Sequence, residues 1–227
     1  LHYLHKMANL CKESYSTVSI EAIKDYYATK GFAVDQYMRL ALASVKAEKD
    51  KKVVKSIIQL FYRPWLENIT FRFQELCKQD ASFITSREIA KECESYVLFV
   101  DAFRYELAEA FCQVLLKYGY KVNLQVKWAS IPTLTPTSKP NVSPIASLVS
   151  TQSGITEFRP QLQNGKDLIT SVFRDTLASV DFKYVTSDSD ITSDEKYWHE
   201  IGDIDTKGHE EQADVVKRID ELFEQVH

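Results

Sequence analysis

A short apolar run at residues 96–100, Tyr-Val-Leu-Phe-Val, is the feature that most constrains the fold of this chain. A continuous run of strand-forming residues is typical of a strand buried on both faces of a parallel sheet. The run stops at Asp101, and residues 103–118 then have the apolar spacing of an amphipathic helix that ends near Gly119. Residues 121–127 alternate apolar and polar side chains, as a strand does. This order predicts a βαβ unit with residues 96–100 as a central parallel strand.

The region before this unit is predicted to be helical throughout. Residues 51–78 carry an apolar stripe at helical spacing, and Pro64 inside it is expected to kink the helix or split it in two. Ser19 is a candidate N-cap, and Gly31 is expected to separate the helix that follows Ser19 from the next one. We therefore divide the chain into a helical region, residues 1–90, and an α/β region, residues 91–227.

The rest of the α/β region is less regular. Residues 130–144 are rich in Pro, Thr and Ser and predict a loop inside which a short helix can start. Four further elements are expected: helices at 166–179 and 210–226, and weaker strands at 182–185 and around 200–201. The predicted fold class is α/β, preceded by an all-helical region.

Composition and charge exclude several classes of protein. The 227 residues hold 28 Lys and Arg against 32 Asp and Glu, a net charge of −4, which disfavours a protein that coats nucleic acid by charge alone. A local basic groove is still compatible with this balance. No apolar run approaches the roughly 18–20 residues of a membrane span, and the N-terminus lacks the pattern of a signal peptide. The first residue is Leu1 rather than Met, which suggests a piece of a longer chain.

The four cysteines form no CxxC pair, so neither a zinc ribbon nor a disulfide framework is expected. We interpret them as reduced thiols of a cytoplasmic protein.

Asp101 is the first candidate functional residue. It is expected where a buried strand ends and a helix begins, and open α/β sheets bind their ligands beyond the carboxyl ends of the strands. The alternative is that Asp101 merely caps the helix.

The second candidate is the segment 131–140, in which threonines alternate between prolines. A threonine hydroxyl is a poor nucleophile unless a base or a metal activates it. Taken alone, this segment is more typical of an ordinary turn.

The third candidate is the segment 203–209, in which Asp205 and His209 are four residues apart. Gly208 between them would let the chain fold sharply and direct both side chains at one ion. A carboxylate oxygen and an imidazole nitrogen suit zinc or manganese. The alternative is a capped helix start, with Asp203 or Asp205 as the cap. His199 has no partner at metal-ligand spacing and is interpreted as structural.

Taken together and in this order, the three segments identify a protein family more specifically than any one of them does. The strings VLFVDAFRYELAEAF, SIPTLTPTSKP and WHEIGDIDTKGHE resemble the PglZ domain of the alkaline phosphatase superfamily, and its type A branch in particular. The resemblance runs from about Tyr96 to the C-terminus, and the preceding helices resemble the upstream helical region of that family.

The resemblance implies a mostly parallel sheet flanked by helices and a site for two divalent metals, zinc or alternatively manganese. Asp101 would be a ligand of one metal, Thr135 the metal-bound nucleophile, and Asp205 with His209 ligands of the other metal. All four side chains would then face one cleft. Arg104 or Lys139 could add charge to bind a phosphate, although a solvated surface position is the favoured interpretation of both.

The resemblance also implies a metal-dependent phosphoesterase from a bacterial phage-defence system of the BREX type. Its substrate would be a phosphate ester or phosphodiester, nucleic acid included, and its partners would be other defence proteins, with no membrane. The family pattern continues after DxxGH with a helix, a strand and a T-x-D-H-G string, and this sequence reaches His227 before any such strand. We therefore expect this chain to bind zinc weakly and not to cleave phosphodiesters. A longer parent protein is expected to bind zinc and to cleave phosphodiesters. The alternative is a non-catalytic scaffold with a vestigial metal site.

Overall fold

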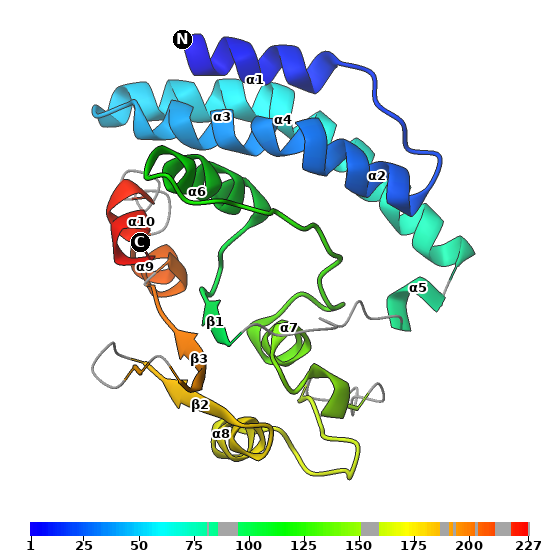
Figure 1. Cartoon of the computed structure of the whole chain (residues 1–227). Helices are drawn as coiled ribbons and strands as arrows, with labels where there is room; N and C mark the ends of the chain where they lie inside the picture. The colour runs from blue at the N-terminus through cyan, green and yellow to red at the C-terminus, as the bar shows by residue number, and fades with distance from the viewer. Residues whose placement is uncertain are drawn as a thin grey trace. The chain divides into compact units, whose positions relative to one another are not determined.

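The computed structural model describes residues 1–80, 82–85, 95–150, 159–186, 191–192, 194–202, 204–211 and 219–226. They form a mixed α/β structure (Figure 1). It divides into two compact units. Unit 1 comprises Leu1–Ala81, Ala102–Val126 and Asp203–His227, and unit 2 comprises Ser82–Asp101 and Lys127–Gly202. The units interleave along the chain, so they are a different division from the boundary near residue 90, which stays a prediction.

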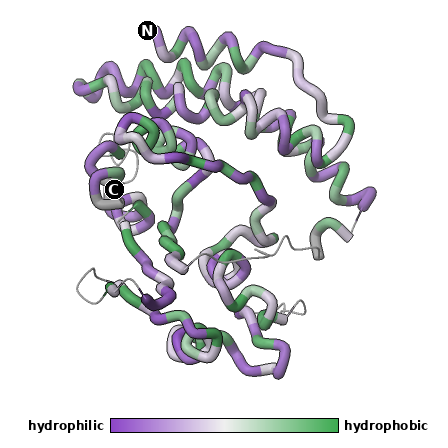
Figure 2. Tube along the Cα trace, in the orientation of Figure 1, coloured by the Kyte–Doolittle hydropathy of each residue, from purple (hydrophilic) through white to green (hydrophobic). Residues whose placement is uncertain are grey.

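All the regular secondary structure described in unit 1 is helical. Its α-helices are α1 (His2–Lys12), α2 (Ile20–Tyr26), α3 (Phe32–Ala43), α4 (Glu48–Gln79), α6 (Tyr105–Lys117), α9 (Ile204–Glu211) and α10 (Ile219–Val226). Helices α1, α3 and α4 pack together and bury a core of Leu4, Met7, Val34, Ala41, Ile58 and Trp65. Hydrophobic and hydrophilic residues alternate along these helices (Figure 2), as expected when one face of each is buried.

Two expectations about the helical region were wrong in detail. Helix α4 runs without a break through Pro64, so the expected split is wrong, and the alternative of a kink stays a prediction. Helices α2 and α3 are joined by a π-helical turn, Tyr27–Gly31, rather than separated at Gly31. A Cβ atom at Gly31 would lie 3.1 Å from the rings of Tyr26 and Tyr27. The glycine therefore allows close packing of the two rings against the backbone.

The N-cap predicted at Ser19 is confirmed. The Ser19 hydroxyl accepts from the Ala22 amide at 3.1 Å.

A buried ionic network ties α3 to α6 inside unit 1. Glu106 is fully buried and accepts from Arg39 Nε at 3.1 Å and from Arg104 Nη2 at 2.7 Å. Asp35, also buried, accepts from the hydroxyls of Tyr27 at 2.5 Å and Tyr62 at 2.7 Å. Because a buried charge is costly without a partner, Arg39 and Glu106 can be buried between α3 and α6 only as a pair.

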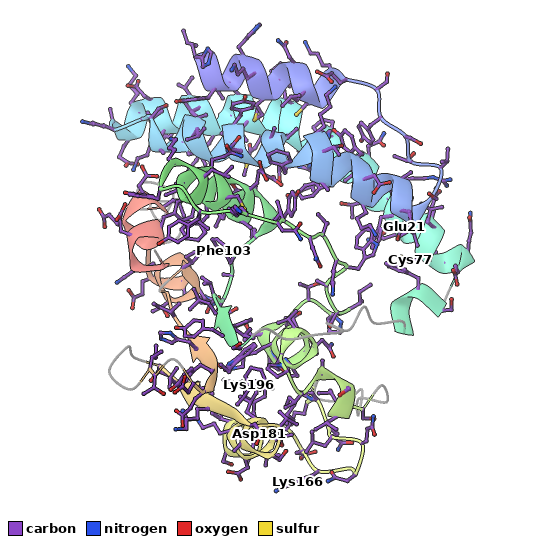
Figure 3. All side chains as sticks on the ribbon, viewed as in Figure 1. Glu21, Cys77, Phe103, Lys166, Asp181 and Lys196 are labelled. Atoms are coloured by element: carbon purple, nitrogen blue, oxygen red, sulfur yellow. The ribbon has the colours of Figure 1, made fainter. Side chains whose placement is uncertain are left out.

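An aromatic cluster accounts for the packing of α10. Phe103, labelled in Figure 3, lies 5.9 Å from Phe111 and 6.3 Å from Phe223, ring centre to ring centre.

The helix predicted at 103–118 is confirmed as α6, and Gly119 follows it with a left-handed φ of 86°. The helix predicted at 210–226 is confirmed only in part. Helix α9 ends at Glu211, α10 begins at Ile219, and residues 212–218 lie outside the described residues.

Unit 2 is built on a three-stranded parallel sheet. Its strands are β1 (Tyr96–Phe99), β2 (Phe182–Val185) and β3 (Lys196–Glu200), and its α-helices are α5 (Ser82–Thr85), α7 (Thr135–Val142) and α8 (Thr170–Ser179). The strand order is β1-β3-β2, so β3 is central and β1 lies at an edge of the described sheet. The parallel strand predicted at residues 96–100 is confirmed for Tyr96–Phe99, but its central position is wrong. Its expected burial on both faces is also wrong, because Tyr96 and Leu98 on one face are exposed.

The second strand of the predicted βαβ unit is also wrong. Residues 121–127 form no strand, and Leu124 is exposed. The neighbour of β1 is instead β3, which pairs Tyr96 with Tyr197 and Phe99 with Glu200. An alternating pattern makes a strand only where another strand is available to pair with it, and that is decided by residues far away in the sequence.

The core of unit 2 lies between the sheet and α8. It contains Ile145, Phe173, Leu177, Phe182 and Trp198, and the Phe173 and Trp198 rings meet edge to face at 5.7 Å. Asp181, labelled in Figure 3, has a left-handed φ of 63° and turns the chain from α8 into β2. The weaker strand predicted at 182–185 is confirmed, and the one expected around 200–201 is the end of β3, which begins at Lys196.

Cys11, Cys77 and Cys112 are free thiols, as predicted, and Cys93 lies outside the described residues. Burial and the nearby Asp35 raise the pKa of the Cys11 thiol to about 11.

In the part of the chain that the structure describes, no helix has both the length and the apolar character needed to cross a membrane.

Candidate active site

The Pro- and Thr-rich segment forms the start of helix α7. The peptide bond before Pro132 is cis, and Thr135 is the first residue of the helix. The expectation that a short helix starts inside this segment is therefore confirmed. Pro136 stands in the first turn, where the absence of an N–H group costs no helical hydrogen bond.

The three alternating threonines have different roles. The Thr133 hydroxyl donates to the backbone carbonyl of Ser130 at 3.1 Å. The Thr137 hydroxyl accepts from the Leu134 amide at 3.3 Å and contacts the Pro132 carbonyl at 2.5 Å, which satisfies the helix start. Both of these hydroxyls are thus bound to the backbone of their own segment. Thr135 is the one whose hydroxyl is directed at a distant side chain.

That distant side chain is Asp101, at the carboxyl end of β1. The Thr135 hydroxyl lies 3.2 Å from Oδ1 and 3.1 Å from Oδ2 of Asp101, so its proton is shared between the two carboxylate oxygens. Thr135 is exposed and Asp101 is half-buried, so both remain accessible from solvent. A hydroxyl that donates to a carboxylate keeps its lone pairs available on the other side of the oxygen. The predicted proximity of Asp101 and Thr135 is confirmed.

A second contact also joins α7 to the carboxyl ends of the strands. Lys139, one helical turn after Thr135, places its Nζ 2.9 and 3.2 Å from the two carboxylate oxygens of Glu200 at the end of β3. The side chains of both residues are only 22% exposed, so the favoured surface position of Lys139 was wrong. Sequence reasoning missed Glu200, because nothing in the residues around it signals a partner 61 positions away.

Asp205 and His209 lie together on α9 in unit 1. His209 Nε2 is 3.7 Å from Asp205 Oδ2, and the two side chains are 82% and 46% exposed. The expected sharp turn at Gly208 was wrong, because the segment is helical and the spacing of four residues itself brings the side chains to one face. Asp203 lies outside the described residues. Since the two units are described separately, the convergence of all four predicted residues in one cleft stays a prediction.

Two other residues considered for the site have structural partners. Arg104 is bound to Glu106 in the ionic network of unit 1, with its side chain 54% exposed. His199 is buried, and its Nδ1 is in hydrogen-bond contact with the Tyr96 hydroxyl on the neighbouring strand. The interpretation of His199 as a structural residue agrees with this burial.

The donor atoms of both pairs suit a divalent cation. Asp101 with Thr135 offers carboxylate and hydroxyl oxygens, and Asp205 with His209 offers a carboxylate and an imidazole, a combination that binds zinc or manganese. In the described part of the chain, no three Asp, Glu, His or Cys side chains gather closely enough to hold a metal by themselves. By itself, each pair would supply at most two ligands to a metal ion.

Comparison with protein-family models, with curated proteins and with solved structures finds no match to this chain. The likeness to the PglZ domain therefore rests on the three sequence strings alone.

Proposed function

We propose that this chain carries part of the active site of a metal-dependent phosphoesterase, with an alkaline-phosphatase-like fold of the PglZ type. The observation that supports the proposal best is the contact between Thr135 and Asp101 at the carboxyl end of β1. Of the three threonines in the segment, the one that the resemblance selects as nucleophile is the one whose hydroxyl meets this carboxylate.

In this proposal, the Thr135 hydroxyl oxygen attacks the phosphorus atom of a phosphate ester, its proton passes to the Asp101 carboxylate, and the bond from phosphorus to the leaving oxygen breaks. Water would then hydrolyse the phosphothreonine, which releases phosphate or its monoester and regenerates Thr135. Asp101 holds the hydroxyl proton on one side, so that a lone pair of the oxygen points to the substrate from the first turn of α7. The helix N-terminus adds backbone N–H groups that favour a negatively charged phosphoryl group nearby. Proximity and orientation of the nucleophile are the contributions of this segment.

The metals would be held by Asp101 with Thr135 at one position and by Asp205 with His209 at the other. Bound zinc or manganese would supply Lewis-acid polarisation of the phosphoryl oxygens and of the leaving oxygen. The remaining ligands would come from residues beyond those described.

The wider setting is part of the same proposal. A PglZ-type protein would act in bacterial phage defence of the BREX type, in the cytoplasm and together with other defence proteins. Nucleic acid would be one natural phosphodiester substrate. The competing function is a non-catalytic scaffold of the defence complex.

The test is hydrolysis of a nitrophenyl phosphodiester, with zinc or manganese, by this chain and by a longer protein that continues beyond His227. We expect the longer protein to turn over and this chain not to. Thr135→Ala should abolish turnover in the longer protein, whereas Thr133→Ala is the matched control, since its hydroxyl is bound to the backbone carbonyl of Ser130. A longer protein that is inert in every metal, or equally active with Thr135→Ala, would overturn the proposal, and inertness would favour the scaffold.

A further inference from the structure

The contact between Lys139 and Glu200 is placed where it can control the candidate nucleophile. Glu200 is paired in register with Phe99 of β1, two residues before Asp101. Lys139 lies on α7 four residues after Thr135. Helix α7 is therefore joined to the carboxyl ends of the strands at two points, through Thr135 to the segment after β1 and through Lys139 to the end of β3. Figure 1 shows α7 beside β1.

The ion pair is embedded in a polar and aromatic setting. Glu200 also accepts from Trp198 Nε1 at 2.9 Å. The Lys139 ammonium lies 5.3 Å from the centre of the Phe173 ring and 6.0 Å from that of Phe99. Burial raises the pKa of Glu200, but hydrogen bonds from Trp198 and Lys139 lower it by more, so the pKa lies below its ordinary value. The carboxylate is thus held in its charged form by partners on two elements.

Helix α7 has few apolar contacts to hold its orientation, although Asn141 on it is buried and donates to the Ser130 hydroxyl. Its sequence, TPTSKPNV, has no apolar stripe, and Val142 at its end is 52% exposed. Pro140 is its one buried apolar residue. A helix of two turns is not stable by itself in water, so its direction has to come from tertiary contacts. A lysine that binds both oxygens of a partly buried carboxylate is such a contact.

We propose that Lys139 and Glu200 are a positioning pair, which sets the direction of α7 and so presents the Thr135 hydroxyl to Asp101. This inference rests on the proposed function for its chemical meaning, because it makes Thr135 the group that has to be aimed. The pair touches neither Thr135 nor the reacting atoms. It acts through the helix.

The first experiment measures amide hydrogen exchange in α7 and the chemical shifts of the Thr135 side chain by NMR, which needs no activity. Glu200→Gln keeps the shape and an acceptor for Trp198 but removes the charge, and Lys139→Met keeps the length of the stem. We expect either change to speed exchange of the Thr137 and Ser138 amides, which donate to the Leu134 carbonyl at 3.1 and 2.8 Å, by about tenfold or more. The chemical shifts of Thr135 should change in the same two variants. Lys139→Arg, which keeps the positive charge, should leave the exchange rates and the shifts near their wild-type values.

Lys183→Met is the matched control. Lys183 pairs with Glu195 in the same unit, but the two side chains are 59% and 37% exposed, and such a pair contributes little. Unchanged α7 exchange and Thr135 shifts in both Glu200→Gln and Lys139→Met would overturn the inference. If Lys183→Met changed them as much, the effect would be general loosening, and the inference would also fail.

The second experiment separates this inference from the proposed function. In the longer protein, Glu200→Gln should lower kcat for the phosphodiester with little change in KM, because the substrate still binds but the hydroxyl is misdirected. Turnover that depends on Thr135 but not on Glu200 would overturn the inference and leave the proposed function intact. An inert protein in which α7 still responds to Glu200→Gln would overturn the proposed function and leave the positioning pair in place.

Discussion

The Thr135 hydroxyl donates to both carboxylate oxygens of Asp101, at 3.2 and 3.1 Å, although the two residues are 34 positions apart in the chain. The contact joins the first residue of α7 to the carboxyl end of β1, the part of a parallel sheet where ligands bind. It is a contact between an exposed hydroxyl and a half-buried carboxylate.

Removing this contact should affect stability little. Thr135 is exposed and Asp101 is only half-buried, so water can replace the lost hydroxyl, and we expect a loss of at most about 1 kcal/mol in the free energy of unfolding. Urea unfolding of Thr135→Ala and Asp101→Ala, followed by circular dichroism, measures it. Loss of the folded state in either variant would show that the pair is structural rather than catalytic.

The Asp205 and His209 pair should bind zinc weakly. Two ligands at a spacing of four residues on an exposed helix leave a cation largely to water, and the imidazole has to be neutral to bind. Calorimetry with zinc at pH 7.5 should therefore show weak binding that His209→Ala reduces. His5→Ala on α1 is the matched control, because His5 is also exposed but has Asn9 four residues later. Equal loss of binding in both variants would place the zinc elsewhere.

The contribution of Glu200 to stability should depend on pH. Because its pKa is lowered in the folded protein, its stabilising effect is complete above the ordinary value of 4.5 and is lost as pH falls through the folded pKa. The difference in unfolding free energy between the wild type and Glu200→Gln should thus be largest near pH 6–7 and shrink below about pH 4.5. Urea unfolding across this range measures it. The difference should be smaller in a Lys139→Met background, and a difference that grows as pH falls would contradict the assignment.

Breaking the ionic network of unit 1 should be the most damaging of these changes. Glu106→Ala removes the carboxylate that binds Arg39, which is 6% exposed, so a buried guanidinium loses its counter-charge. We expect a loss of about 3–5 kcal/mol, since removing one partner of a buried pair leaves the other uncompensated. Glu109→Ala, three residues later on α6, pairs with Gln113 at an exposed position and should stay within about 0.5 kcal/mol. Equal unfolding midpoints for the two variants would contradict this reading.

Several elements could be predicted from the sequence because their causes are local. Helix α6 follows from the spacing of its apolar residues, and the start of α2 from the hydroxyl of Ser19. The approach of Asp205 to His209 needs only the helical repeat. The position of Asp101 at the end of a parallel strand follows from the apolar run before it.

The tertiary structure decided what depends on pairing across long stretches of chain. β3, not residues 121–127, became the neighbour of β1, because a strand is completed by hydrogen bonds to a partner that its own pattern does not specify. The position of α7 against the sheet decides that Thr135, rather than Thr133 or Thr137, contacts Asp101. It also decides that Lys139 pairs with Glu200. Helical hydrogen bonds close within four residues, whereas these contacts span 34 and 61, so only the folded chain brings them within bonding distance.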